Sequence, residues 1–242
     1  MRTYALLVAL AAGLAAPAVA PGAPARAGAG PAVVARYTFD PAGAMADASG
    51  RGHTLRVVAN NGGTVRSIAH GTGHALAFPA RCAARAARTC PHAVLQAAAA
   101  ADLNPGARPI AYGASVRLTR TQTTGGQNVV QKGYSTTSSQ YKLQIDGAAG
   151  RPSCVLVDDR KPAIRLVRSG VPVADGRWHT VECRRSGPSF AILVDGATRG
   201  AMTVPAALSV TNSGPLSVGG KGAYRDNDKF QGALDDVWVR IG

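Results

Sequence analysis

The clearest alternation of apolar and polar side chains lies between residues 175 and 196. Val181 and Cys183 fall on one face of the first run, with polar side chains between them. After a Ser-Gly-Pro break, Phe190 and Ile192 begin a second run that ends at an Asp-Gly pair. A period of two, bounded by Gly, Pro and Asp-Gly, is typical of strands joined by a tight turn. The pattern therefore predicts an antiparallel hairpin.

Short runs of the same kind recur along the chain, bounded by Gly, Pro, Asn or Ser. Five alanines at 97–101 favour a helix, but Asp-Leu-Asn-Pro follows directly, so we expect a short strand and a turn at 94–105. Short strands separated by turn signals predict an all-β fold, an antiparallel β-sandwich in one domain. The other expected strands are 33–40, 55–58, 65–68, 75–78, 110–118, 128–132, 141–146, 154–157, 164–167, 216–219 and 230–240.

Three motifs, in a fixed order, resemble a known family. Tyr-Thr-Phe-Asp at 37–40 precedes Asp-Ala-Ser-Gly-Arg-Gly-His at 47–53, and Asp-Gly-x-Trp-His-x-Val opens the hairpin at 175–181. Phe-Gln-Gly-Ala-Leu-Asp-Asp-Val-Trp-Val then occupies 230–239. Together they resemble laminin G-like domains, which implies a concanavalin A-like jelly roll over residues 33–242. With its cysteines, the chain is similar to secreted laminin G-like proteins of actinobacteria.

Residues 1–27 have the pattern of a secretion signal: a basic start, a short apolar run, and small-x-small cleavage sites ending at Ala20 and Ala27. Pro21 would follow the first site, so we expect cleavage after Ala27, with an uncleaved anchor as the alternative. Residues 28–32 are then a flexible tail. We expect a secreted, extracellular protein, because no other stretch is long and apolar enough to span a membrane.

The charge of the chain is strongly positive. Lys and Arg total 27 against 13 Asp and Glu, which gives a formal net charge of +14. A basic balance attracts nucleic acid, anionic glycans or acidic surface polymers. The basic residues are spread out, however, and no stripe of alternating basic and aromatic residues is present, so we expect no nucleic-acid partner. Dispersed surface charge and an anion-binding face remain two open interpretations.

The four cysteines, an even number in a chain with an export signal, predict disulfides. Three pairings are possible, and we expect Cys82–Cys90, which closes a short loop, and Cys154–Cys183, which joins two predicted strands. The rival interpretation is a zinc site completed by a histidine, His92 or His179. It is disfavoured because the chain has no Cys-x-x-Cys pair and the expected compartment is oxidising.

Catalytic patterns are weak. A glycosidase needs two carboxyl groups flanking the scissile bond, but Glu182 is the one glutamate of the chain and stands in no such pattern. Asp158 and Asp159 are adjacent and would point to opposite faces of a strand. The five histidines are scattered, and we expect His179 to pack structurally. A lyase that uses Tyr141 or His179 in place of two carboxylates is the alternative.

The family resemblance also implies a structural calcium ion. In related sandwiches this ion ties the N-terminal strand region to an aspartate near the C-terminus, and calcium prefers carboxylate and carbonyl oxygens. The alternative is that these aspartates cap turns and accept hydrogen bonds from backbone amides. The matching positions are Asp40, Asp47, Asp235 and Asp236, with carbonyls from residues 49–53.

Glycan sites combine aromatic platforms with a few directional polar groups. We expect Trp178 and Trp238 to pack in the core, which leaves loop tyrosines and an arginine as candidates for contact with a ligand. The expected ligand-binding residues are Tyr134, Tyr141, Tyr224 and Arg225.

These observations favour a secreted, non-catalytic recognition module. Its expected partner is an extracellular glycan, a cell-wall or cell-surface polymer, or a protein. A polysaccharide hydrolase or lyase on the same sandwich is the alternative, and a structural envelope component is a third. One sandwich fold hosts many activities, so the fold by itself does not decide between these functions.

Overall fold

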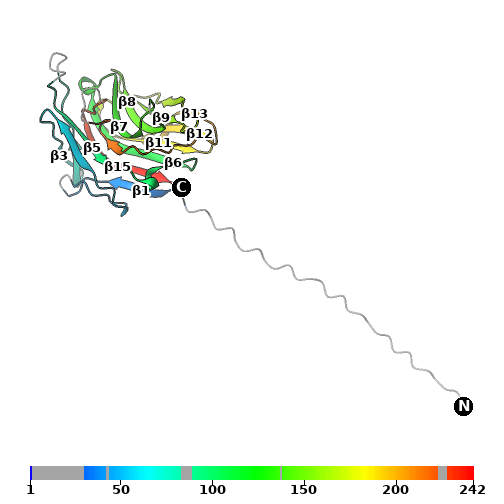
Figure 1. The fold of residues 1–242 in the computed structure, drawn as a ribbon. Coiled ribbons are helices and arrows are strands. Elements are labelled where there is room, and N and C mark those ends of the chain that lie inside the picture. Colours follow the sequence, from blue (N-terminus) through cyan, green and yellow to red (C-terminus); the bar gives the residue numbers. More distant parts are fainter. Residues whose placement is uncertain (2–29, 42–43, 83–88, 137, 223–227) are drawn as a thin grey trace.

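The structure is a computed structural model, and it describes residues 1, 30–41, 44–82, 89–136, 138–222 and 228–242. The predicted signal, apart from Met1, and the first two residues of the predicted tail lie outside this part of the chain. Two antiparallel sheets form two stacked layers (Figure 1). The predicted all-β, antiparallel sandwich is therefore confirmed.

One layer, called sheet A, places strands from distant parts of the chain side by side. Its two central strands, β6 and β15, pair with each other although β7 to β14 lie between them in the chain. The order is β13 (Ala197–Thr203), β12 (Ser189–Val194), β11 (Asp175–Ser186), β6 (Ile110–Thr119), β15 (Ala233–Ile241), β4 (Gly73–Ala77) and β3 (Arg66–His70), with β1 (Ala32–Tyr37) also paired to β15.

The other layer, sheet B, is a second antiparallel array that faces the first. Two short 3₁₀ helices, η2 (Ala101–Leu103) and η3 (Arg120–Gln122), flank β6 in the chain. The order is β10 (Ile164–Arg168), β9 (Arg151–Val157), β8 (Gln140–Asp146), β7 (Gly126–Gly133), β14 (Leu216–Val218), β5 (His92–Ala97) and β2 (Arg56–Asn60).

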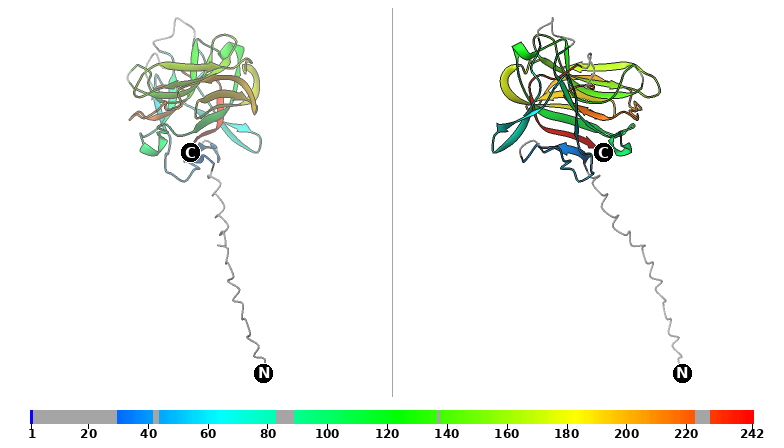
Figure 2. Two further views of the ribbon diagram at one scale, coloured as in Figure 1. Left: turned by 90° about the vertical axis from the view of Figure 1, so that its right-hand side faces the viewer. Right: turned by 60° about the vertical axis from the view of Figure 1, so that its left-hand side comes forward.

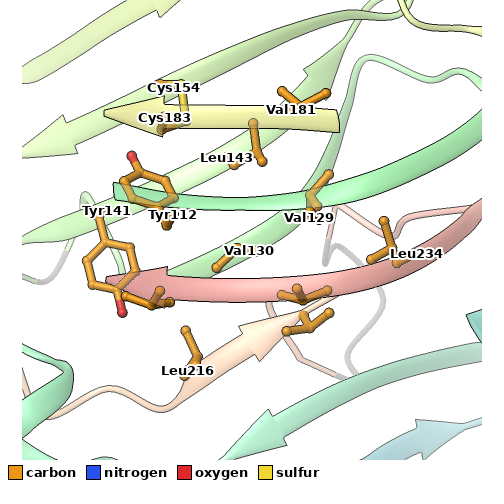
Figure 3. Close-up of a cluster of buried hydrophobic side chains, with 14 of the residues drawn as sticks. Tyr112, Val129, Val130, Tyr141, Leu143, Cys154, Val181, Cys183, Leu216 and Leu234 are labelled. Atoms are coloured by element: carbon orange, nitrogen blue, oxygen red, sulfur yellow. A yellow bond between two sulfur atoms is a disulfide. The ribbon is translucent and has the colours of Figure 1, made fainter. Parts of the chain in front are cut away.

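The core fills the space between the sheets, where alternate side chains of each strand point inward. Tyr112 of β6 and Tyr141 of β8 meet there with ring centroids 5.1 Å apart, and neither is exposed to solvent (Figure 3). Beside them, a disulfide joins Cys154 of β9 to Cys183 of β11, as the sequence predicted. This bridge ties one sheet to the other, and a loop of its size removes about 3–4 kcal/mol of unfolded-chain entropy.

The β11–β12 hairpin matches the predicted one. Val181 pairs with Val194 and Ser186 with Ser189, so the ladder is in register to the turn. Gly187 makes this turn with a φ of 54°, in the left-handed region that favours glycine. The turn chemistry and the alternating pattern therefore determine the same register.

β13 is the one strand of the described chain that the sequence pattern did not predict. Its sequence, Ala-Thr-Arg-Gly-Ala-Met-Thr, carries no apolar alternation, because the strand lies at the edge of sheet A. Gly200 lies where a Cβ atom would come within 2.4 Å of the Arg168 carbonyl oxygen of β10. Close approach of the two sheets at this edge, and not strand propensity, determines the residue.

The first and last strands lie together. Ala32 of β1 pairs with Ile241 of β15, and Figure 1 and Figure 2 show the C-terminal end beside β1. Among the described residues, no helix is long and apolar enough to cross a membrane.

Two buried cations connect loops to the sandwich. Arg185 of β11 is 1% exposed, and its guanidinium donates hydrogen bonds to four backbone carbonyls, those of Ala107, Arg108, Gly187 and Ala206, at 2.6–3.2 Å. Lys132 of β7 is fully buried, and its ammonium donates to carbonyl oxygens of Asn212 and Gly214. Buried charges persist when their hydrogen-bonding capacity is filled in this way.

Candidate functional site

The ligand-binding residues predicted from the sequence do not form one site. Tyr141 is buried between the sheets and donates its hydroxyl hydrogen to the Leu103 carbonyl, so its prediction as a ligand contact was wrong. Burial raises the pKa of this phenol well above its usual range. Tyr134 is half-buried beside sheet B, where its hydroxyl donates to the Lys221 carbonyl at 3.0 Å. Tyr224 and Arg225 lie outside the described residues.

Asp47, predicted as a calcium ligand, is instead surrounded by protein donors. Its two carboxylate oxygens accept hydrogen bonds from the amides of Arg36, Ser49 and His53 and from the Ser49 hydroxyl, at 2.8–3.1 Å. Burial by itself raises the pKa of Asp47, but these hydrogen bonds outweigh it and hold the pKa below its ordinary value. Four donors fill the lone pairs that a cation would need, so the alternative interpretation of Asp47, turn capping, fits the geometry.

The other three aspartates have protein partners as well. Asp40 accepts the His74 amide at 2.6 Å, Asp236 forms an ion pair with Arg36 at 2.7 Å, and Asp235 lies 2.5 Å from His70 Nδ1. In the part of the chain that the structure describes, no three His, Cys, Asp or Glu side chains gather as a metal site. The predicted aspartates therefore do not fit a calcium ion.

The cysteines are all consumed by disulfides in the structure, since Cys82 bonds to Cys90 as well as Cys154 to Cys183. Thiolates are then unavailable as zinc ligands, so the rival zinc interpretation does not hold. Near the first bridge, the Lys229 ammonium lies 2.9 Å from the Cys90 sulfur. This contact brings the segment before β15 against the loop before β5.

The residues considered for catalysis have structural partners. His179 is held between two carboxylates, with Nδ1 2.8 Å from Asp195 and Nε2 3.1 Å from Asp175. Glu182 forms an ion pair with Arg184 at 2.6 Å. Burial lowers the pKa of His179, but the hydrogen bonds to Asp195 and Asp175 outweigh it, so the pKa lies above its ordinary value. The histidine therefore fastens the start of β11 to the turn after β12.

A groove crosses the outer face of sheet A, the face turned away from sheet B. Arg66 of β3 pairs with Ala77 of β4, Ala77 with Ala233 of β15, Ala233 with Arg117 of β6, and Arg117 with Trp178 of β11. Directly paired residues of antiparallel strands share a face, so these five side chains form one row across five strands. We call them the arginine row. Two alanines lie between two arginines, which leaves the middle of the row hollow.

The groove over the arginine row has a volume of about 690 Å³ and opens to solvent. Arg66 and Ile68 line it on the β3 side, and Arg117 and Thr119 line it on the β6 side. Its remaining lining residues are small, apolar or uncharged polar side chains: Gly62, Thr64, Ala77, Phe78, Pro79, Ala80, Pro91, Leu118, Gln122, Gly176, Gln231, Gly232 and Ala233. Among the described residues, this lining contains two guanidinium groups and no carboxylate.

An aromatic cluster adjoins the groove at Arg117. The Trp178 ring stacks on the His70 ring with centroids 3.9 Å apart, and the Arg117 guanidinium carbon lies 5.0 Å from the centre of the Trp178 ring. His70 in turn contacts Asp235. Trp178 is half-buried and on the outer face, so the prediction that it packs in the core was wrong. A cation over an aromatic face is held electrostatically, so Trp178 restricts where Arg117 can point.

Trp238 is buried, at 6% exposure, but it too lies on the outer side of sheet A. Its neighbours Val237 and Val239 point into the core, and a Cβ atom on Gly113 of β6 would come within 2.9 Å of its ring. The glycine makes the space that the indole fills. Trp238 is therefore part of the outer face rather than of the inter-sheet core.

Chemically, the groove can donate charged hydrogen bonds from two fixed strands to an extended ligand, but its described lining presents no acid–base pair. Sequence reasoning did not find it, because Arg66 and Arg117 lie on strands that become near neighbours only in the folded sheet. The available signal was local: Arg117 occupies a polar position within the alternating run at 110–118, which marks it as outward-facing.

A sequence family described as the concanavalin A-like lectin/glucanases superfamily matches residues 94–240. No curated protein matches the chain.

Solved structures share the fold at low sequence identity. Domain 4 of AbnA, an extracellular arabinanase from Geobacillus stearothermophilus, in complex with arabinotriose, superposes with a TM-score of 0.66 at 14% identity, covering 88% of this chain and 93% of that one. The binding domain of botulinum neurotoxin DC in complex with SialylT gives 0.61 at 10%, covering 86% and 47%. The binding domain of Paraclostridial Mosquitocidal Protein 1 gives 0.60 at 10%, covering 81% and 45%.

This chain therefore spans about half the length of the two toxin domains and nearly all of the arabinanase domain. At such identities the likeness concerns the fold alone, which in each case is the two-layer sandwich described above. The family match extends over more than half of the sequence, from β5 to β15. The chain belongs to the concanavalin A-like lectin/glucanase superfamily.

Proposed function

We propose that this protein is a secreted recognition module that binds an extracellular glycan in the groove of sheet A without cleaving it. The observation that carries the proposal is the groove over the arginine row, with its volume of about 690 Å³. A pocket of this size is within the range of ligand sites. Its hollow centre comes from the paired Ala77 and Ala233, so the shape is built into the register of four strands.

The lining supports binding rather than turnover. Glycoside hydrolysis needs two carboxyl groups on either side of the scissile bond, whereas the groove is lined by Arg66, Arg117 and uncharged side chains. The candidate lyase residues do not help, because Tyr141 is buried and His179 is held by two carboxylates. Thr119 and Gln122 add polar groups with which sugar hydroxyls can form hydrogen bonds.

The similar structures agree with a glycan partner. One of them, the arabinanase domain, was solved with arabinotriose, and a toxin binding domain was solved with SialylT. Another structure of the toxin domain contains rat synaptotagmin II, so the same fold also contacts proteins. The groove favours a glycan for this chain, since small residues form its floor and polar groups line it, unlike a broad apolar patch.

Secretion is supported by two disulfides, which persist in oxidising compartments. Expression of the full chain in an exporting host, followed by mass determination of the protein in the medium, tests it. We expect a mature protein that begins after Ala27 and has no free thiol. Retention of residues 1–27 or recovery only inside the cells would contradict secretion.

Binding is tested with a panel of immobilised plant, microbial and cell-wall polysaccharides, and turnover is followed in parallel by release of reducing ends and of unsaturated products. We expect retention on at least one polymer and no product. An Ala77→Trp variant fills the floor and abolishes retention, whereas Ala201→Trp, the same change on the exposed edge strand β13, leaves it intact. Product release, or retention that survives Ala77→Trp, would refute the proposal.

A further inference from the structure

We infer that the groove selects acidic polysaccharides, whose repeated carboxylate or sulfate groups are held by Arg66 and Arg117. This inference rests on the proposed function and names its ligand class. Both side chains line the groove, Arg66 exposed and Arg117 half-buried. Within the described residues, neither guanidinium has an ion-pair partner in the protein, so both are available to an anion from outside.

The electrostatic surroundings of the groove favour the same sign of ligand. Three further arginines, Arg81, Arg120 and Arg177, directly follow or precede lining residues in the chain. Cations gathered around a hollow attract a polyanion and raise its local concentration.

Two carboxylates on strands of the arginine row already have partners within the protein. Asp235 lies two residues after Ala233 on β15, and one of its carboxylate oxygens is 2.5 Å from His70 Nδ1. Asp175, at the start of β11, contacts His179 and accepts the Arg177 amide. These hydrogen bonds hold the pKa of Asp175 below its ordinary value. Neither carboxylate lines the groove, and among the described residues neither Arg66 nor Arg117 forms an ion pair.

The spacing of the two arginines leaves room for an extended ligand between them. Arg66 and Arg117 are the first and fourth members of the arginine row, and three strand spacings of about 4.8 Å separate their backbones by about 14 Å. A chain of sugars with charges at intervals can place one anion at each end and lie over Ala77 and Ala233 between them.

The chemistry of the end groups fits this geometry. A guanidinium presents a planar fork of N–H donors that binds a carboxylate or sulfate through two parallel hydrogen bonds. At Arg117 the fork is restrained by the Trp178 ring, which itself is stacked on His70. Trp178 is therefore a positioning residue for Arg117, since it lowers the freedom that the side chain loses on binding.

Two matched pairs of polymers test the inference: polygalacturonate against its fully methyl-esterified form, and dextran sulfate against dextran. Each pair keeps the backbone and removes the charge. We expect the wild-type protein to bind at least one charged member about tenfold or more tightly than its neutral counterpart, because charge-assisted hydrogen bonds are worth more than a factor of ten each. The pair that shows the difference tells whether carboxylate or sulfate is the anion. Added salt should weaken the binding.

Substitutions then locate the contact. Arg66→Gln and Arg117→Gln should each weaken binding to the charged polymer about tenfold, and Trp178→Leu should weaken it less. Arg199→Gln removes the same charge from β13, at the opposite edge of sheet A, and should leave binding unchanged. Equal losses in Arg199→Gln and Arg117→Gln would show that only net charge matters, which would overturn the inference.

The same assays separate this inference from the proposed function. Equal affinity for charged and neutral members of both pairs, or full binding by the Arg66→Gln, Arg117→Gln double variant, overturns the acidic ligand class. Groove binding as such then still stands if Ala77→Trp abolishes retention on a neutral polymer. Loss of binding to every glycan in the panel would refute both.

Discussion

Arg185 and the pair Arg66 and Arg117 show two opposite uses of arginine in one sheet. Arg185 is buried, and four backbone carbonyls from three segments accept its hydrogen bonds. Arg66 and Arg117 line an open groove, where Arg117 has an aromatic ring beneath it and neither has an anionic partner among the described residues. Arg185 stabilises the fold, whereas the guanidinium groups of Arg66 and Arg117 can bind a ligand.

The difference shows why the net charge of +14 by itself does not indicate a ligand. Each cation has to be examined for its partners in the folded chain. Lys132 and Arg185 have their donors filled by carbonyls, and Arg36 and Arg184 are neutralised by carboxylates. Arg66 and Arg117 in the groove have no such partner among the described residues. We therefore predict that replacing them changes ligand binding, whereas replacing the buried cations changes the stability of the fold.

Replacement of Arg185 should have the largest effect on stability. In Arg185→Met up to four carbonyls lose their donor, and a buried acceptor left unsatisfied costs about 1–3 kcal/mol. We expect a loss of about 3–5 kcal/mol in the free energy of unfolding, measured with urea, since entering water satisfies some carbonyls. Arg184→Met, at the exposed neighbouring position, should cost less than about 1 kcal/mol. Similar losses in the two variants would mean that the carbonyls around Arg185 contribute little.

His179 is an intermediate case, a cation whose charge depends on pH. Its folded-state pKa is raised by Asp195 and Asp175, so its stabilising effect is complete below the unfolded pKa of about 6.5 and is lost as pH rises through the folded value. We expect His179→Gln to cost up to about 1 kcal/mol at pH 5.5, because both carboxylates are half exposed, and less at pH 8.5.

Melting temperatures of wild type and His179→Gln, recorded across this pH range, measure the difference. A gap that widens as the pH rises would show that the neutral histidine makes the stabilising contact and would contradict the assignment.

The groove arginines should change stability little. Arg66→Gln is expected to stay within about 0.5 kcal/mol of wild type, since surface substitutions away from special contacts rarely exceed this. Arg117→Gln loses its position over Trp178 and is expected to cost up to about 1 kcal/mol. Urea unfolding of both variants, beside Arg185→Met, tests the division between binding and folding. A loss of several kcal/mol in the free energy of unfolding of Arg66→Gln would show that Arg66, like Arg185, stabilises the fold.

The smallest effect on the melting temperature is expected from a chelator or from added calcium. Asp47 already accepts four hydrogen bonds from protein donors, Asp236 pairs with Arg36, and Asp235 contacts His70. We therefore expect no change in melting temperature on adding a chelator or millimolar calcium. A shift of several degrees that depends on calcium would show that the ion binds despite these contacts, because a ligand of the folded state stabilises it in proportion to its occupancy.

Local patterns predicted most of the strands because most strands have one buried face. The hairpin of β11 and β12 could be read from Val181, Cys183 and Ile192, whose spacing determines both the face and the register. Edge strand β13 could not be read, since half-exposed edge residues carry little alternation. Tyr141 was misplaced because its neighbourhood includes a polar loop, although its position in the 141–146 run already put it on the apolar face of β8.

The candidate site was less accessible to sequence reasoning. The arginine row exists because β15, from the end of the chain, lies between β4 and β6, and no local pattern encodes that order of strands. Trp178 was expected in the core because it belongs to a motif that resembles the family pattern. Only the register with Arg117 reveals that it faces outward. The expectation of a calcium ion took no account of the partners of the four aspartates, because nearby amides and an arginine cannot be seen in a list of carboxylates.

The pairing of β1 with β15 determines how the domain responds to a mechanical load. Ala32 lies opposite Ile241, so a pull between the two ends of the sandwich opens this ladder from its tip, one rung after another, rather than by sliding the strands. Such unzipping needs little force. Further on, the Cys154–Cys183 bond carries the load past residues 154–183, so the chain between the two cysteines is not extended while the bond is intact.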